Sequence, residues 1–118
     1  MVNVTIKRIY DSVDKTDGYR VLVDRLWPRG ISKEKAHLDL WLKDVAPTSE
    51  LRKTFGHDVS KFEAFKKEYI KELQEGKQQE AFQRLREIVR ENDQVTLLYG
   101  AKDKRHNQAV ILKELMGQ

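Results

Sequence analysis

Two short apolar runs constrain the fold of this chain more than any other feature. Val21-Leu22-Val23 lies within a predicted strand over residues 19–26, and Val95-Thr96-Leu97-Leu98-Tyr99 predicts a second strand. Both runs are apolar at nearly every position, whereas a strand with one solvent face alternates. Strands of this kind are covered on both sides, as in a parallel sheet.

The remaining segments predict further strands and several amphipathic helices. Residues 3–10 read as a strand, and alternating leucines over residues 38–42 predict another, with a helix as the alternative. Helical spacing and capping residues predict four helices. The first runs from Thr48 or Ser49 to Phe55-Gly56, and the second runs from a capping box at Ser60 and Glu63 to Glu75, where Gly76 ends it. The third covers residues 78–91, and Asp103 caps the last.

Buried strands followed by amphipathic helices indicate a three-layer α/β domain. The chain has 118 residues, which suits one domain over residues 1–118 because typical domains have ~100–150 residues. We expect a small, mainly parallel sheet of about four strands that is covered by helices.

Composition narrows the functional classes. The chain has no cysteine, which excludes thiol nucleophiles, and its three histidines lack metal-site spacing, so we expect no metal and no cofactor. The 23 Lys and Arg are interleaved with 19 Asp and Glu, so the net charge of +4 favours a solvated mixed surface over a nucleic-acid interface. Without a membrane-spanning run or a signal peptide, we expect a cytoplasmic protein with no membrane contact. The oligomeric state stays open.

Charged and aromatic residues follow both apolar runs. The first run leads into a turn that carries Asp24, Arg25, Trp27 and Arg29. The second ends at Tyr99 and leads into a loop that carries Lys102 and Asp103. Because ligands of open α/β sheets bind outside the carboxyl ends of the strands, these residues predict one site for an anion, with Trp27 or Tyr99 stacking on a ring. The alternative is that these side chains only pair within the fold and cover the edge of the core.

Three histidines are candidates for proton transfer or for purely structural roles. His57 and Asp58 precede a predicted helix and form either a general base with its orienting carboxylate or a capping loop. His106 and Asn107 are expected in the first turn of the last helix, where they face either the Lys102 pocket or solvent. We interpret His37 as structural.

Four motifs, in a fixed order, resemble a known family. They are Asp24-Arg25-Leu26-Trp27-Pro28-Arg29-Gly30, Trp41-Leu42-Lys43-Asp44-Val45-Ala46-Pro47, Phe55-Gly56-His57-Asp58, and Leu97-Leu98-Tyr99-Gly100-Ala101-Lys102-Asp103 with His106-Asn107. With them the chain resembles the short, YeaO-like branch of the bacterial domain-of-unknown-function 488 family over residues 6–115. The resemblance implies a compact cytoplasmic α/β domain and no particular activity. In longer relatives the last strand ends in a cysteine, and a Cys-His-Arg sequence follows at the start of the helix. This chain has Tyr99 and Asn107 at the matching positions, and it keeps only the histidine, His106. Thiol chemistry is therefore not implied.

Two functions are open on the sequence alone. The first is a small enzyme that acts on an anionic, nucleotide-like small molecule: Arg25, Arg29 and Lys102 hold the anion, while His57 or His106, with Asp24 or Asp103, moves protons. The second is a noncatalytic module that binds a small ligand or nucleic acid. A pocket with both acids and bases favours the first function, and a broad basic stripe favours the second.

Overall fold

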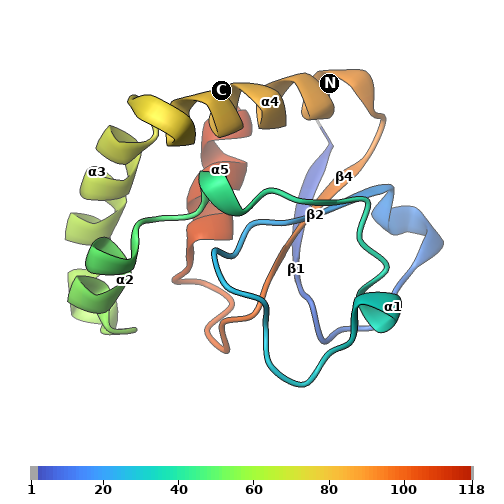
Figure 1. Ribbon diagram of the computed structural model, residues 1–118, viewed down its shortest axis with the longest axis horizontal. Coiled ribbons are helices and arrows are strands. Elements are labelled where there is room, and N and C mark those ends of the chain that lie inside the picture. Colours follow the sequence, from blue (N-terminus) through green and yellow to red (C-terminus); the bar gives the residue numbers. More distant parts are fainter. Residues whose placement is uncertain (1–2, 118) are drawn as a thin grey trace.

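The computed structural model describes residues 3–117, which fold around one four-stranded sheet (Figure 1). The strands are all parallel, in the order β1-β4-β2-β3, with the bounds β1 (Val4–Arg8), β2 (Tyr19–Leu22), β3 (Leu40–Trp41) and β4 (Val95–Tyr99). β4 is buried at every position and lies between β1 and β2, as its apolar run predicts. The small parallel α/β fold expected from the sequence is confirmed.

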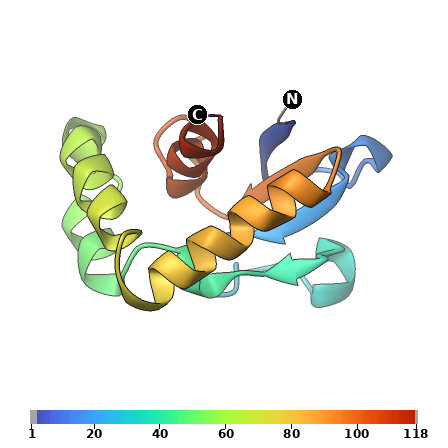
Figure 2. The ribbon, with the colours of Figure 1, turned by 90° about the horizontal axis from the view of Figure 1, so that it is seen from above.

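Long helices cover mainly one face of the sheet. Buried side chains of α4 (Gly76–Glu91) and α5 (Gln108–Met116) join those of β2 and β4 in the main core. The neighbouring helices α2 (Ser49–Phe55) and α3 (Phe62–Glu72) extend this core through their aromatic residues. Figure 2 shows the α2–α3 pair set to one side of α4, α5 and the strands. Three short 3-10 helices connect these elements: Lys15–Asp17, Lys43–Val45 and Val59–Lys61.

The opposite face of the sheet has a thinner cover. Its smaller core consists of Ile9, Leu22, Ala36 and Leu98, and both tryptophans pack against it. The cover comes from the four-residue helix α1 (Lys33–Ala36) and from the loops after β1 and β2. The third layer is therefore present, but it is made largely of loops.

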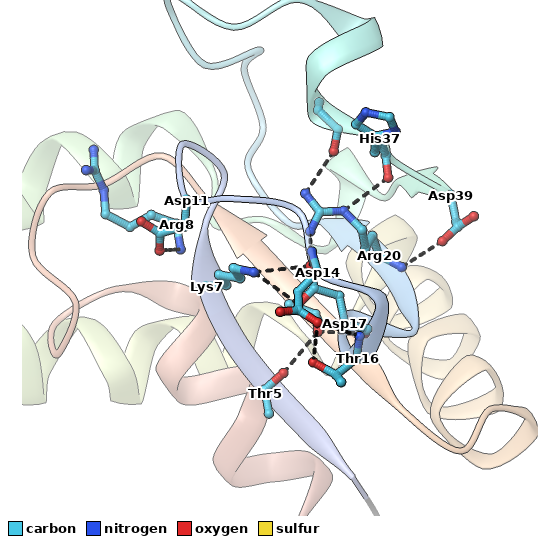
Figure 3. A network of polar contacts seen from close by, with 12 residues as sticks. Thr5, Lys7, Arg8, Asp11, Asp14, Thr16, Asp17, Arg20, His37 and Asp39 are labelled. Atoms are coloured by element: carbon cyan, nitrogen blue, oxygen red, sulfur yellow. Dashed lines mark hydrogen bonds and ion pairs between the residues drawn. The ribbon is translucent and has the colours of Figure 1, made fainter.

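A buried ionic network lies on this second face (Figure 3). Asp17 is only 6% exposed, and its carboxylate accepts a hydrogen bond from Lys7 Nζ at 3.1 Å and another from the Arg20 guanidinium. Arg20 also donates to the backbone oxygens of Ala36 at 2.9 Å and His37 at 3.1 Å. The network thereby holds the loop before β2 and the end of α1 against the sheet.

The last helix begins later than the sequence predicts. α5 starts at Gln108, and its cap is Asn107, whose Oδ1 accepts a hydrogen bond from Val110 N at 3.1 Å. Asp103, the predicted cap, instead closes the preceding turn by accepting from the backbone N–H of His106 at 3.1 Å. His106 and Asn107 therefore precede the first helical turn rather than forming it.

Two boundaries around α3 also differ. Asp58 caps the turn that leads into α3, because its carboxylate accepts from both the backbone N and the Oγ of Ser60, the predicted cap. α3 ends at Glu72, and Gly76, the predicted stop, instead opens α4.

The helix alternative for residues 38–42 is wrong, since β3 occupies Leu40–Trp41. Within residues 3–117, none of the helices has the length and apolar character that crossing a membrane requires.

Candidate functional site

A cleft of about 600 Å³ lies outside the carboxyl ends of β2 and β4. Most of its wall comes from residues 24–29 after β2, from residues 100–101 and 106–107 between β4 and α5, from Gln108 at the start of α5, and from residues within 52–57. In Figure 1 the loops after β2 and β4 both lie below the sheet. The two strand-end segments are therefore brought together, as parallel strands that end at one edge of a sheet require.

Among the described residues, Asp24 is the only carboxylate that lines the cleft. Its Oδ2 accepts a hydrogen bond from Gly100 N at 2.9 Å, and its Oδ1 accepts one from Gln108 Nε2 at 2.6 Å. Burial raises the pKa of Asp24 to about 6, although both hydrogen bonds and the nearby Arg52 charge favour the ionised form. A Cβ at position 100 would lie 3.0 Å from Asp24 Oδ2, so the glycine permits this close approach.

Four cationic side chains line the same cleft: Arg25, Arg29, Arg52 and Lys53. Arg25 is held in place because its Nε donates to Pro47 O at 3.0 Å and its Nη2 to Ala46 O at 2.9 Å. Arg52 extends from α2, and within residues 3–117 no hydrogen bond or ion pair engages its guanidinium. Arg25 is thus a fixed part of the wall, whereas Arg52 can reorient toward a ligand.

Trp27 forms a fixed aromatic part of the wall. Its indole Nε1 donates to Ile31 O at 2.8 Å, and its ring packs edge-on against Trp41 with centroids 5.4 Å apart. Trp41 Nε1 in turn donates to Asp24 O at 2.7 Å. Arg29 is exposed at the rim, where its backbone oxygen accepts from Tyr10 Oη at 2.6 Å.

Three predicted binding residues, Tyr99, Lys102 and Asp103, lie outside the cleft wall. Tyr99 is 2% exposed and belongs to the main core, on the side of β4 that it shares with Val95 and Leu97, so its ring is not available to a ligand. Burial also raises the pKa of the Tyr99 hydroxyl. Lys102 is exposed on the loop after β4 but is not part of the wall, to which Gly100 and Ala101 contribute instead.

The His57–Asp58 pair does not form. His57 lines the cleft with a backbone φ of 59°, a left-handed conformation that residues other than glycine rarely adopt. Asp58 is turned toward Ser60, with its Oδ1 accepting from Ser60 N at 3.0 Å and from Ser60 Oγ at 2.7 Å. The capping alternative therefore accounts for Asp58.

A different histidine has a carboxylate partner. His106 Nδ1 lies 2.9 Å from Asp103 Oδ2, and the His106 ring packs edge-on against Phe62 with centroids 5.1 Å apart. His106 lines the cleft, whereas Asp103 does not.

Asn107 lines the cleft as a structural residue, because its Oδ1 caps α5 and its Nδ2 donates to Asp103 O at 2.8 Å. His37 is exposed at the end of α1.

Several lining residues were missed by the sequence analysis: Tyr10, Arg52, Lys53, Phe55 and Gln108. Arg52 and Lys53 lie in the last turn of α2, directly before the Phe55-Gly56-His57 motif, and proximity to that motif is the only sequence signal for them. No group of three or more metal-ligating side chains occurs in the part of the chain that the structure describes.

The chain has bacterial relatives along nearly its whole length. The family model described as the inactive DUF488-N3 subclade matches residues 3–118. The uncharacterized protein YeaO of Escherichia coli strain K12 is 44% identical over 117 residues, 96% of each chain. The uncharacterized protein Rv3073c of Mycobacterium tuberculosis strain H37Rv is 35% identical over 113 residues, 96% of this chain and 92% of that protein. No solved structure matches the chain.

Proposed function

The chain belongs to the inactive DUF488-N3 subclade, and we propose that it binds an anionic, nucleotide-like small molecule in the strand-end cleft without transforming it. The charge of the cleft carries this proposal. Arg25, Arg29, Arg52 and Lys53 line it, and within residues 3–117 the single carboxylate in its wall is that of Asp24. A cleft with such an excess of positive charge attracts anions.

The guanidinium groups of Arg25 and Arg52 suit a phosphate group. A guanidinium is planar and can donate two parallel hydrogen bonds to phosphate or carboxylate oxygens. Arg25 is already ordered by the backbone oxygens of Ala46 and Pro47, so binding costs little of its side-chain entropy. Arg52 has no partner within residues 3–117 that a ligand would need to displace.

The size and the aromatic wall of the cleft suit a ring-bearing ligand. Its volume of about 600 Å³ falls within the range of ~300–1,000 Å³ that is typical of small-molecule sites. Trp27 is held rigidly by Ile31 and Trp41, and a rigid indole offers a large contact area for a ring. These features support a nucleotide-like ligand over a simple inorganic anion.

The cleft holds an acid, Asp24, and two histidines, His57 and His106, which is the pattern that favours an enzyme on the sequence alone. Three observations nevertheless support binding over catalysis. The subclade is described as inactive. Asp58 does not orient His57, because it caps the turn before α3. The carboxylate of Asp103, the partner of His106, also accepts hydrogen bonds from the backbone N–H groups of Arg105 and His106, so it closes a turn.

Titration calorimetry with AMP and GMP tests the proposal. We expect at least one nucleotide to bind, and Arg52→Gln to weaken it by about 10- to 100-fold, since a hydrogen bond to a charged group contributes ~1.5–3 kcal/mol. The matched control is Arg84→Gln, which removes the same charge from the exposed side of α4 and should leave affinity within about twofold. Absence of binding, or equal losses in the two variants, contradicts a specific site in the cleft.

A further inference from the structure

A carboxylate in the wall of a cationic cleft is unexpected for a site that binds only an anion. Asp24 lines the cleft together with Arg25, Arg29, Arg52 and Lys53. A negative group on the ligand would be repelled by it, since like charges raise the energy. Either Asp24 serves the fold alone, or the ligand presents hydrogen-bond donors to it.

The contacts of Asp24 leave room for such donors. Its two protein partners, Gly100 N and Gln108 Nε2, are neutral, and each bonds one carboxylate oxygen. An ionised carboxylate has about four acceptor sites, so about half of them are unused. Asp24 therefore keeps acceptor capacity at the wall, and none of the described residues forms a direct ion pair with it.

Arg52 supplies the complementary group. Its guanidinium is near enough to Asp24 to favour the charged carboxylate, yet the two do not form an ion pair. Both side chains line the same cleft, so the space between them is accessible to a ligand. A molecule with N–H donors at one end and an anion at the other would contact both side chains.

We propose that the cleft selects guanine nucleotides, with the guanine N1–H and 2-amino groups donating to Asp24 and the phosphate pairing with Arg52. This inference rests on the proposed function and adds the identity of the base. Guanine presents two N–H donors side by side, which match two carboxylate oxygens. Adenine presents a ring-nitrogen acceptor on the same edge, which would face the carboxylate oxygens without a hydrogen between them.

Asp24→Asn separates base recognition from the structural role of Asp24. The asparagine oxygen can still accept from Gly100 N, and the Gln108 amide can turn so that its oxygen accepts from the asparagine amide. The second N–H of that amide then faces the ligand. It opposes the 2-amino group of guanine and suits the 2-oxo group of xanthine.

The experiment is a calorimetric titration of the wild type and Asp24→Asn with GMP, IMP, AMP and XMP at pH 7.5. We expect the wild type to bind GMP about tenfold or more tightly than AMP, with IMP, which lacks the 2-amino group, in between. We expect Asp24→Asn to bind XMP more tightly than GMP. A purely structural role of Asp24 would weaken all four ligands alike.

The outcomes distinguish this inference from the proposed function. Equal affinity of the wild type for GMP and AMP overturns the guanine assignment and leaves anion binding in place. Failure of all four nucleotides to bind overturns both. A folded Asp24→Asn protein that still prefers GMP over XMP also overturns the assignment. If that variant does not fold, the order of affinities in the wild type decides.

Discussion

Replacing Asp24 by asparagine should remove a pH dependence from the free energy of unfolding. The pKa of the Asp24 carboxyl is about 6 in the folded chain, against an ordinary value of 3.8, because burial outweighs the hydrogen bonds from Gly100 and Gln108 and the charge of Arg52. One pKa unit corresponds to ~1.4 kcal/mol. The ionised carboxylate therefore costs the folded chain about 3 kcal/mol at neutral pH.

The direction in which the free energy of unfolding changes with pH follows from proton binding to Asp24. Between pH 3.8 and about 6, the folded chain holds the Asp24 proton more tightly than the unfolded chain does. The contribution of Asp24 to stability is therefore complete at low pH and is lost as the pH rises through about 6. The stability of Asp24→Asn minus that of the wild type should rise by about 3 kcal/mol from acid to neutral pH. Carboxyls with a lowered pKa, such as those of Asp17 and Asp103, titrate in both proteins and cancel in this difference.

Urea unfolding at a series of pH values measures this difference. Trp27 and Trp41 flank the Asp24 loop and pack on the smaller core, so their fluorescence reports unfolding there. The slope of free energy against urea concentration should stay equal in the two proteins, because the surface exposed on unfolding is the same. A stability difference that is flat across the range refutes the raised pKa. A difference that falls with pH means that the ionised carboxylate stabilises the fold.

Two further substitutions test the buried network and a close backbone approach. Arg20→Met should cost about 3–5 kcal/mol in urea unfolding, because it removes the more buried of the two cations that pair with Asp17 and leaves the backbone oxygens of Ala36 and His37 without their donor. A loss below ~1 kcal/mol would mean that Lys7 alone compensates Asp17. Gly18→Ala places a Cβ 2.2 Å from a backbone oxygen, whereas Gly76→Ala, also at positive φ, meets nothing within 4 Å. The first should therefore lower the melting temperature more than the second, and equal losses contradict the steric argument.

The inner strands of the sheet were predictable because a run that is apolar at nearly every position indicates burial on both faces. The run at residues 95–99 is β4, and the run at residues 21–23 lies at the end of β2, which stops at Leu22 rather than at the predicted residue 26. Helix ends were less predictable because several residues near each end have the right chemistry. Asp103 and Asn107 are both good caps, and only the path of the loop after β4 decides between them.

The candidate site was predictable in its location and less so in its members. Tyr99 ends a run that is apolar at nearly every position and buried throughout, so the run itself indicated a core position for it. Arg52 had no comparable signal, because it comes from a helix whose position against the sheet depends on tertiary packing. The role of Asp58 stayed open between a catalytic pair and a capping loop, because capping and catalytic pairing use the same kinds of residue.

The central position of β4 has a consequence during synthesis. β1 pairs only with β4, and the contact between Thr5 and Thr96 spans 91 positions of the chain. Closing so large a loop is entropically costly and slow. A nascent chain that has not yet released residues 95–99 from the ribosome has no partner for β1 and leaves one edge of β2 uncovered. Until then β2 can pair with β3, but β1 and the second edge of β2 stay exposed to chaperones, proteases and other unfinished chains, so the sheet is complete only when nearly the whole polypeptide has been made.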